Sequence, residues 1–259
     1  MSSLQSTDLS IRISNKNVCD KLNLDIQPGQ VWGILGRNGV GKTTLLHTLA
    51  GLRNADSGSI LLDQKNINEL NRKQIAKKLG LLLQQSEESF PSSVIDTVLT
   101  GRHPHIGNWS WESKDDLAIA KNALEIVDMT DMAERSIEHL SGGEKQRVAI
   151  ASLIAQSPDI YLLDEPNSHL DLKHQLQLLQ YFSEHASQKN SATIMTLHDI
   201  NLAQQYCTHL ILLFGEGSVC IGETNKLLNE TSLSELYQYP LHKTITKHGT
   251  VFIPQKPDL

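Results

Sequence analysis

The feature that most constrains this chain is the segment Gly36-Arg37-Asn38-Gly39-Val40-Gly41-Lys42-Thr43, which fits the pattern G-x-x-x-x-G-K-[ST]. An apolar run at 31–35 precedes it as a predicted strand, and a predicted helix begins at Thr43. The glycines allow successive backbone N–H groups to converge on an anion, and the helix N-terminus adds partial positive charge. The segment therefore predicts a phosphate-binding strand–loop–helix unit. The alternative, a chance glycine-rich turn, is disfavoured by this context.

The side chains at the end of this loop indicate a nucleoside triphosphate as the ligand. Lys42 supplies a full positive charge for the β- and γ-phosphates. The Thr43 hydroxyl is the expected Mg²⁺ ligand, and Thr44 is a weaker candidate for the same role.

Composition fits an ordinary globular protein of 259 residues, with 39% hydrophobic and 20% charged residues. The formal charge of −6 gives no general basic surface, so we expect no nucleic-acid partner. Cys19, Cys207 and Cys220 form no C-x-x-C pair, which favours a reducing compartment. No apolar run approaches the ~18–20 residues of a membrane helix, and residues 1–8 contain no signal-peptide core. We therefore expect a cytoplasmic protein that contacts a membrane only through a partner.

Predicted strands and helices alternate along most of the chain. Strands are expected at 9–13, 22–26, 31–35, 59–62, 79–83, 160–163, 193–197 and 210–214. Helices are expected after the phosphate loop and at 71–78, 114–127, 141–156 and 172–185. This alternation predicts an α/β fold, a mainly parallel sheet with helices on both faces. Residues 86–135 are interpreted as an inserted, mostly helical lobe, and the tail from about 225 as helix and then a strand near 250–253.

Two carboxylates, Asp164 and Glu165, follow the predicted apolar strand 160–163. Ligand groups collect at the C-terminal ends of parallel strands, and neighbouring strand residues point to opposite faces. We therefore assign Asp164 to Mg²⁺, directly or through water. We assign Glu165 to polarising the water that attacks the γ-phosphate. The alternative is a solvated acidic turn ended by Pro166.

Two further polar residues follow predicted strands at the same edge. His198 comes just past the strand 193–197, where an imidazole can contact a γ-phosphate and the attacking water. Gln84 ends the strand 79–83, where its amide can bind Mg²⁺ or the water and can sense the inserted lobe. Gln85 is the adjacent candidate for the role of Gln84. For His198 and for Gln84, the alternative is an ordinary solvated side chain without a function.

A second candidate phosphate site lies at 140–147, with the sequence L-S-G-G-E-K-Q-R. Ser141 and Glu144 fit a capping box that opens a helix. Gly142 and Gly143 leave the start of that helix bare, so backbone N–H groups, the Ser141 hydroxyl and the helix dipole can together accept phosphate. We expect both interpretations to hold. One chain needs only one phosphate-binding segment to bind a nucleotide. The presence of a second segment therefore bears on how the nucleotide is used, and not only on whether it is bound.

Taken in order, these motifs resemble those of the ATP-binding cassette (ABC) ATPases, the motor subunits of transporters. The match covers nearly the whole chain, and it adds the loop 168–171 (S-H-L-D) to the segments above. The sequence L-S-G-G-E is very specific to this family. The resemblance implies a P-loop NTPase fold with an N-terminal antiparallel β portion. It implies a core of residues 1–85 and 136–224, an inserted helical subdomain at 86–135 and a tail at 225–259.

The resemblance also implies a head-to-tail homodimer that encloses ATP and Mg²⁺. One copy would bind ATP through the residues already named, Lys42, Thr43, Gln84, Asp164, Glu165 and His198. The other copy would cover it with Ser141, Gly142 and Gly143, and Asp171 would couple the two sites across the interface. ATP would close the dimer and hydrolysis would reopen it.

A finer resemblance is to the subfamily that serves importers of iron–siderophore complexes, haem and cobalamin. It is carried by Gly101-Arg102-His103-Pro104-His105, Trp109, Glu112-Ser113, Ser168-His169-Leu170-Asp171 and His198-Asp199-Ile200-Asn201. It implies two membrane permease subunits as partners, docked by a cytoplasmic helix in a groove of the inserted lobe and the Gln84 region. It also implies an external substrate-binding protein and a location at the cytoplasmic face of the inner membrane. His103 and His105 lack the further ligands that a metal site needs.

Two positions depart from the family pattern. Ile13 stands where an aromatic residue usually stacks on adenine, which implies looser nucleotide selectivity, and Asn167 replaces a usual Thr. The alternatives are a soluble cassette ATPase acting on nucleic acid or ribosomes, an exporter subunit, and a phosphate-loop kinase. Soluble ATPases of this family tend to carry two cassettes in one chain, or long coiled-coil or zinc-binding insertions, which this sequence lacks. An exporter subunit fits the nucleotide-binding motifs but not the segment Gly101–His105. In a kinase, residues 141–144 would be only a helix cap.

Overall fold

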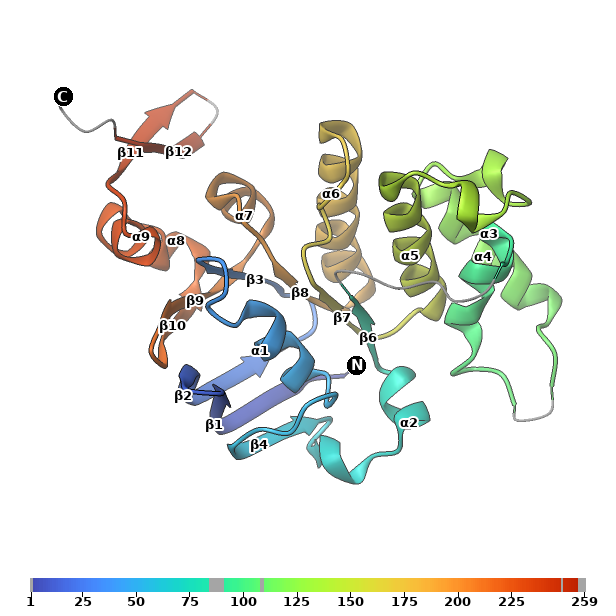
Figure 1. Cartoon of the computed structure of the whole chain (residues 1–259), viewed down its shortest axis with the longest axis horizontal. Helices are drawn as coiled ribbons and strands as arrows, with labels where there is room; N and C mark the ends of the chain where they lie inside the picture. Colours follow the sequence, from blue (N-terminus) through green and yellow to red (C-terminus); the bar gives the residue numbers. More distant parts are fainter. Residues whose placement is uncertain (1, 84–90, 108–109, 248, 256–259) are drawn as a thin grey trace.

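The computed structural model describes residues 2–83, 91–107, 110–247 and 249–255. Gln84, Gln85 and Trp109, which the sequence singled out, lie outside the described residues. In Figure 1 an antiparallel sheet lies at the lower left, a larger sheet at the centre and a helical lobe on the right, while the C-terminal hairpin lies at the upper left, away from the lobe. Within the described ranges, no helix is both long and apolar enough to cross a membrane.

The centre of the described chain is a six-stranded sheet with the order β10-β9-β3-β8-β7-β6. From β9 to β6 neighbouring strands run parallel, and β10 pairs antiparallel with β9. The predicted mainly parallel sheet is therefore confirmed. The strands are β3 (Val31–Gly36), β6 (Leu79–Leu82), β7 (Ile160–Leu163), β8 (Ala192–Thr196), β9 (His209–Gly215) and β10 (Ser218–Glu223).

A four-stranded antiparallel sheet with the order β2-β1-β4-β5 forms the N-terminal portion. Its strands are β1 (Leu4–Ile13), β2 (Lys16–Ile26), β4 (Ser57–Leu62) and β5 (Lys65–Asn66). Helix α1 (Lys42–Leu49) lies beside this sheet (Figure 1), and Leu45 and Leu46 share a core with Trp32 and Ile34 of β3. One face of the central sheet is thus buried under α1 and the antiparallel sheet.

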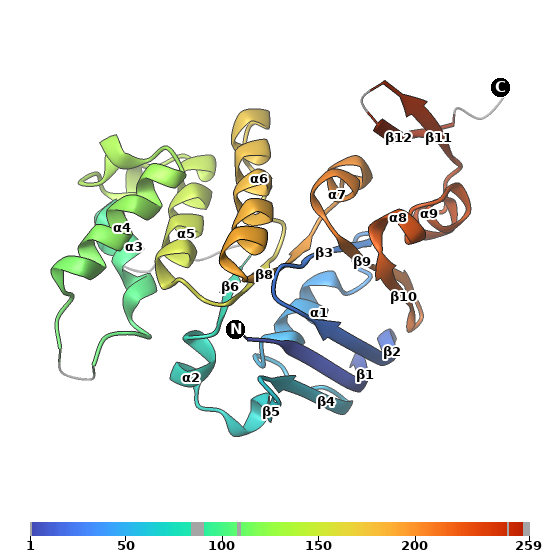
Figure 2. The same cartoon turned by 180° about the vertical axis from the view of Figure 1, so that it is seen from behind.

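Helices α5 (Gly142–Gln156), α6 (Leu172–Lys189) and α7 (Ile200–Tyr206) lie on the other side of the central sheet (Figure 2). Residues of β3 alternate between the two faces of the sheet, as expected of a strand. Trp32 and Ile34 belong to the core beneath α1. Val31 and Leu35 belong to a second core, which contains Val148 of α5. Continuous apolar strands such as β3 are what a sheet buried on both faces requires.

The lobe beside α5 is helical in its described residues. It contains α3 (Val94–Leu99) and α4 (Lys114–Ile126), and α2 (Arg72–Ala76) precedes it. Two features of the 101–105 segment hold the lobe to α5. A Cβ on Gly101 would lie 2.1 Å from the Ser152 carbonyl oxygen. The Arg102 guanidinium donates to Asp116 Oδ1 at 2.8 Å and to the Ala155 carbonyl at 2.8 Å.

The tail consists of α8 (Thr224–Leu227), α9 (Glu230–Tyr237) and a hairpin of β11 (Leu241–Thr246) and β12 (Gly249–Pro254). The sequence analysis did not predict α3, α7, β10 or β11, and it ended α6 four residues too early. Strand β10 has no regular alternation of buried and exposed residues, and α7 buries only Ala203 fully. Both elements lack the periodicity on which sequence prediction depends.

Candidate functional site

The loop between β3 and α1 has the backbone geometry that its glycines permit. Gly39 and Gly41 have positive φ angles of 73° and 113°, in the region that side chains disfavour. A Cβ on Gly41 would also lie 2.6 Å from the Val18 methyl groups. Gly41 is the N-cap of α1, so the positive end of the helix dipole lies at this loop.

The Lys42 side chain is folded into this loop and is only 6% exposed. Its Nζ donates to the Gly36 carbonyl at 2.9 Å and to the Arg37 carbonyl at 3.4 Å. Burial lowers the pKa of Lys42, and the nearby Glu165 and Asp164 carboxylates oppose that shift. The charge is therefore held at the point where a phosphate would meet the loop.

Asp164 follows β7 and is completely buried. Its Oδ1 accepts a hydrogen bond from Thr196 Oγ1 at 2.9 Å. Its Oδ2 is buried without a hydrogen-bond partner in the described structure. Since an unsatisfied buried carboxylate oxygen is costly, this atom fits a cation ligand, and carboxylate oxygens are what Mg²⁺ selects.

Glu165 and His198 meet across neighbouring strands, with Oε1 and Nε2 2.8 Å apart. Glu165 adopts a left-handed backbone conformation with φ of 48°, which is uncommon for a non-glycine residue. Both residues line a pocket of about 460 Å³, together with Asn38, Gly39, Gly41, Lys42, Thr43 and Thr44. The structure thus brings the predicted phosphate loop, Glu165 and His198 to one place.

Ile13 lines this pocket and also an adjoining hollow of about 450 Å³. The hollow is bounded by Ser14, Asn15, Lys16 and Val18 and by the loop residues Gly39, Val40 and Gly41. Among the described residues, no phenylalanine, tyrosine or tryptophan lines either space. The position that the sequence matched to an adenine-stacking residue is therefore beside the loop, but its side chain is aliphatic.

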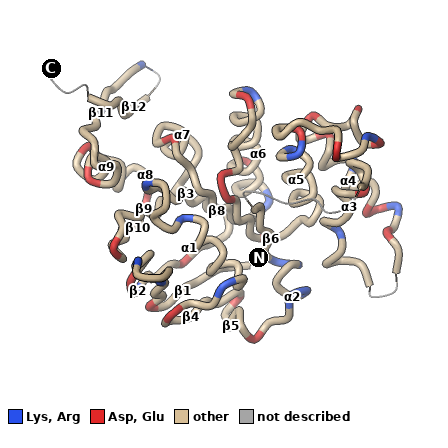
Figure 3. Tube along the Cα trace, viewed as in Figure 1, with Lys and Arg blue, Asp and Glu red and all other residues tan. Residues whose placement is uncertain are grey.

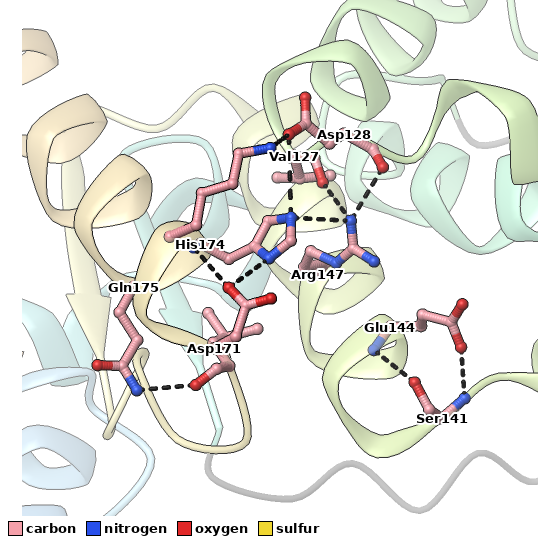
Figure 4. Close-up of polar contacts among 10 residues, drawn as sticks. Val127, Asp128, Ser141, Glu144, Arg147, Asp171, His174 and Gln175 are labelled. Atoms are coloured by element: carbon pink, nitrogen blue, oxygen red, sulfur yellow. Dashed lines mark hydrogen bonds and ion pairs between the residues drawn. The ribbon is translucent and has the colours of Figure 1, made fainter.

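Ser141, Gly142 and Gly143 are not among the residues that line the Lys42 pocket. The predicted capping box is present, because Ser141 N donates to Glu144 Oε2 at 2.7 Å and Glu144 N donates to Ser141 Oγ at 3.3 Å (Figure 4). The Ser141 N–H lowers the pKa of the Glu144 carboxyl.

The two glycines of this segment differ, although the sequence analysis treated them alike. A Cβ on Gly142 would have nothing within 4 Å, whereas a Cβ on Gly143 would lie 2.7 Å from the His169 carbonyl oxygen. Gly143 therefore allows α5 to approach the loop after Glu165, and Gly142 leaves open space.

Asp171 is the N-cap of α6, and its Oδ1 accepts from His174 N at 2.9 Å and contacts His174 Nδ1 at 2.8 Å. Arg147 of α5 extends this network to the lobe (Figure 4). Its guanidinium donates to the Val127 and Asp128 carbonyls at 3.1 and 2.9 Å and lies 3.5 Å from His174 Nε2. The Asp171 loop, α5 and the end of α4 are thus joined by polar contacts that no sequence motif indicated.

Comparison with known proteins identifies the family. The family profile described as "ABC transporter" matches residues 19–168, more than half of the chain. This chain belongs to the ABC transporter family. The membership confirms ATP as its nucleotide and ATP hydrolysis as its activity, and it decides against the kinase alternative.

The curated relatives and the solved structures agree with this assignment. The chain is 38% identical, over 82% of its length and 78% of the relative, to a probable siderophore transport system ATP-binding protein, YusV, of Bacillus subtilis. It is 34% identical, over 92% of its length and 88% of the relative, to the iron(3+)-hydroxamate import ATP-binding protein FhuC of the same organism. A solved transporter described as of the metal-chelate type, in an inward-facing conformation, matches 99% of this chain and 98% of its own with a TM-score of 0.84 and 30% identity.

The sequence analysis missed one residue of this site, Thr196. It is the last residue of β8, and it contacts both Asp164 and the backbone of Glu165. The signal in the sequence was a hydroxyl at the end of the predicted strand, two residues before His198.

Proposed function

We propose that this chain is the ATP-hydrolysing subunit of an importer for iron–siderophore complexes or a related metal chelate such as haem or cobalamin. The functions of its two Bacillus subtilis relatives support this substrate class. The observation that carries the proposed catalytic roles is the Glu165–His198 pair, which lines one pocket together with Lys42 and Thr43.

In this proposal, Lys42 and the backbone N–H groups of residues 36–41 bind the phosphates of ATP. Glu165 polarises the attacking water, because it is the partly exposed carboxylate of the pocket and a hydrogen-bonded imidazole fixes its position. His198 contacts the γ-phosphate from the same side. Gln84, which lies outside the described residues, remains a proposed ligand of Mg²⁺ or of the attacking water.

The proposed Mg²⁺ ligands are Thr43, Gln84 and Asp164. The buried, unpartnered Oδ2 of Asp164 supports a cation at this point. When bound, the ion would neutralise charge on the β- and γ-phosphates. The protein's contribution is to hold the Asp164 carboxylate in one orientation and to keep the Lys42 ammonium within the loop.

We propose a head-to-tail homodimer in which Ser141, Gly142 and Gly143 of one copy cover the ATP of the other. The open space beside Gly142 and the N-terminus of α5 support an anion contact from outside the chain. Asp171 would couple the two sites through its loop, whose contacts reach Arg147 and the lobe.

We further propose that two permease subunits dock on the lobe, which places the chain at the cytoplasmic face of the cell membrane and links it indirectly to a substrate-binding protein. In this division, residues 1–85 and 136–224 are the nucleotide-binding core, 86–135 the inserted subdomain and 225–259 the tail. A groove of about 620 Å³ between α2 and residues 103–107 and 110–112 suits a permease helix. Trp111 on its wall is 91% exposed, an unusual state for so large an apolar side chain. Basic and acidic residues are interspersed along the described chain (Figure 3).

The hydrolysis is tested by comparing Glu165→Gln with Lys42→Ala. Glu165→Gln should bind ATP normally but hydrolyse it at least about 100-fold more slowly. Lys42→Ala should lose most ATP binding. Near-normal turnover by Glu165→Gln would place the water-activating group elsewhere.

The transport role is tested in vesicles that contain the permease and its binding protein. ATP-dependent uptake of a radiolabelled ferric siderophore should stop with Glu165→Gln. Trp111→Ala should reduce co-purification with the permease, whereas Ile245→Ala, also highly exposed but on the tail hairpin, should not. Equal co-purification of the two variants would refute docking in this groove.

A further inference from the structure

We propose that Thr196 is a positioning residue that sets both carboxylates of the ATP site through a single hydroxyl. Thr196 Oγ1 donates to Asp164 Oδ1 at 2.9 Å and accepts from the Glu165 backbone N–H at 2.6 Å. One side chain on β8 therefore contacts two consecutive residues after β7 that have different proposed roles.

The direction of these two bonds follows from the chemistry of the groups. The Glu165 N–H can only donate, so the hydroxyl oxygen accepts there and its one proton is directed to the Asp164 carboxylate. Thr196 is completely buried, where a hydroxyl without partners would be unfavourable. Both hydrogen bonds are thus satisfied together, and neither can be kept with an apolar residue at this position.

The first bond fixes the orientation of the Asp164 carboxylate. With Oδ1 held by Thr196, the rotation of the carboxylate is determined, and Oδ2 is the atom left for a cation. Without the hydroxyl, both oxygens of a completely buried carboxylate would lack a partner from β8, and its orientation would be free to change.

The second bond fixes the backbone that carries Glu165. This residue has a φ of 48°, a left-handed conformation that is unfavourable for a non-glycine residue. The bond from its N–H to Thr196 stabilises the peptide at this turn and so the placement of Oε1 beside His198. Thr196 therefore acts through Asp164 and Glu165, and it is not itself a catalytic residue.

The same strand supplies a matched control. Thr193 is also completely buried on β8, but its hydroxyl has no hydrogen-bond partner among the described residues. Thr193→Val and Thr196→Val make the same chemical change in the same strand, and only the second removes contacts to the site. Thr196→Ser retains the hydroxyl and provides the rescue.

The test measures ATP binding by calorimetry with Mg²⁺ and with EDTA, and ATP turnover, for the wild type and these three variants. Thr196→Val should reduce the Mg²⁺-dependent gain in ATP affinity and the kcat about 10- to 100-fold, the range for residues that orient metal ligands. Its ATP affinity in EDTA should stay within about threefold of the wild type, since the Lys42 loop is unaffected. Thr196→Ser should recover most of both losses, and Thr193→Val should match the wild type.

Several outcomes would overturn the proposal. Thr196→Val with wild-type Mg²⁺ dependence, or equal losses in Thr196→Val and Thr193→Val, would show that the hydroxyl does not position the site. If Thr196→Val is poorly folded, Thr196→Cys and Thr196→Ser are compared instead, because a thiol is a weak hydrogen-bonding group and serine retains the hydroxyl. A similar Mg²⁺ dependence of ATP binding in these two variants would contradict a role for the hydroxyl bonds. The inference rests on the proposed function, but a wild type without Mg²⁺-dependent ATP hydrolysis would refute that function by itself, before any variant is compared.

Discussion

Replacing Asp116 with Asn tests the contact that ties the helical lobe to α5. The Arg102 guanidinium, and after it the Ser113 hydroxyl and N–H, lower the pKa of the Asp116 carboxyl from 3.8 to about 2. The two side chains are only 10% and 13% exposed, so solvent screens the pair weakly. At about 1.36 kcal/mol per pH unit, this lowering corresponds to roughly 2.5 kcal/mol of unfolding free energy.

The sign of the pH dependence is fixed by the lowered pKa. The stabilisation is fully present above the unfolded-state value of 3.8 and is lost as the pH falls through about 2. The difference in unfolding free energy between wild type and Asp116→Asn should therefore be roughly 2.5 kcal/mol at pH 7 and about half of that at pH 3.

The assay is urea unfolding of the wild type, Arg102→Met, Asp116→Asn and the double variant at both pH values. Lys173 and Asp128 form the control pair, because their side chains are 67% and 47% exposed. Their coupling should be below about 1 kcal/mol. The reasoning is wrong if Asp116→Asn costs no more than Asp128→Asn, or if its cost does not change between pH 7 and pH 3.

Three further predictions follow from single contacts. Gly143→Ala should lose about 1–3 kcal/mol of unfolding free energy, because its Cβ would lie 2.7 Å from the His169 carbonyl, whereas Gly142→Ala should not be destabilised; equal melting temperatures would contradict this. Ile13→Tyr should tighten ATP binding about two- to tenfold by adding a ring beside the loop, and calorimetry showing unchanged affinity would remove Ile13 from the base site. Arg147→Met should lower the unfolding free energy by about 1–3 kcal/mol, because the Val127 and Asp128 carbonyls lose their donor; a cost equal to that of Lys145→Met would refute the role of these bonds.

The sequence predicted those parts of the site that are local in the chain. The loop from Gly36 to Thr43 carries its own conformation in its glycines. Glu165 and His198 lie together, as the rule that parallel strands end at a common edge leads one to expect. The capping box of Ser141 and Glu144 is likewise a contact between residues three apart.

The parts that could not be predicted depend on contacts between distant segments. Thr196 meets Asp164 only because β8 and β7 are neighbours in the sheet, and Arg102 reaches the Ala155 carbonyl only after the lobe packs on α5. Gly143 differs from Gly142 solely through the approach of the His169 backbone. Local propensity holds no information about such tertiary contacts.

The central claim is that two copies complete each other's ATP site. A mixture of Asn38→Cys and Ser141→Cys chains, each in a Glu165→Gln, Cys220→Ser background, tests it, because Cys19 and Cys207 are buried. With ATP and a mild oxidant, position 38 of one copy should crosslink to position 141 of the other, and omission of ATP should abolish the product. Absence of this crosslink from a mixture shown to be ATP-loaded and dimeric would contradict the account.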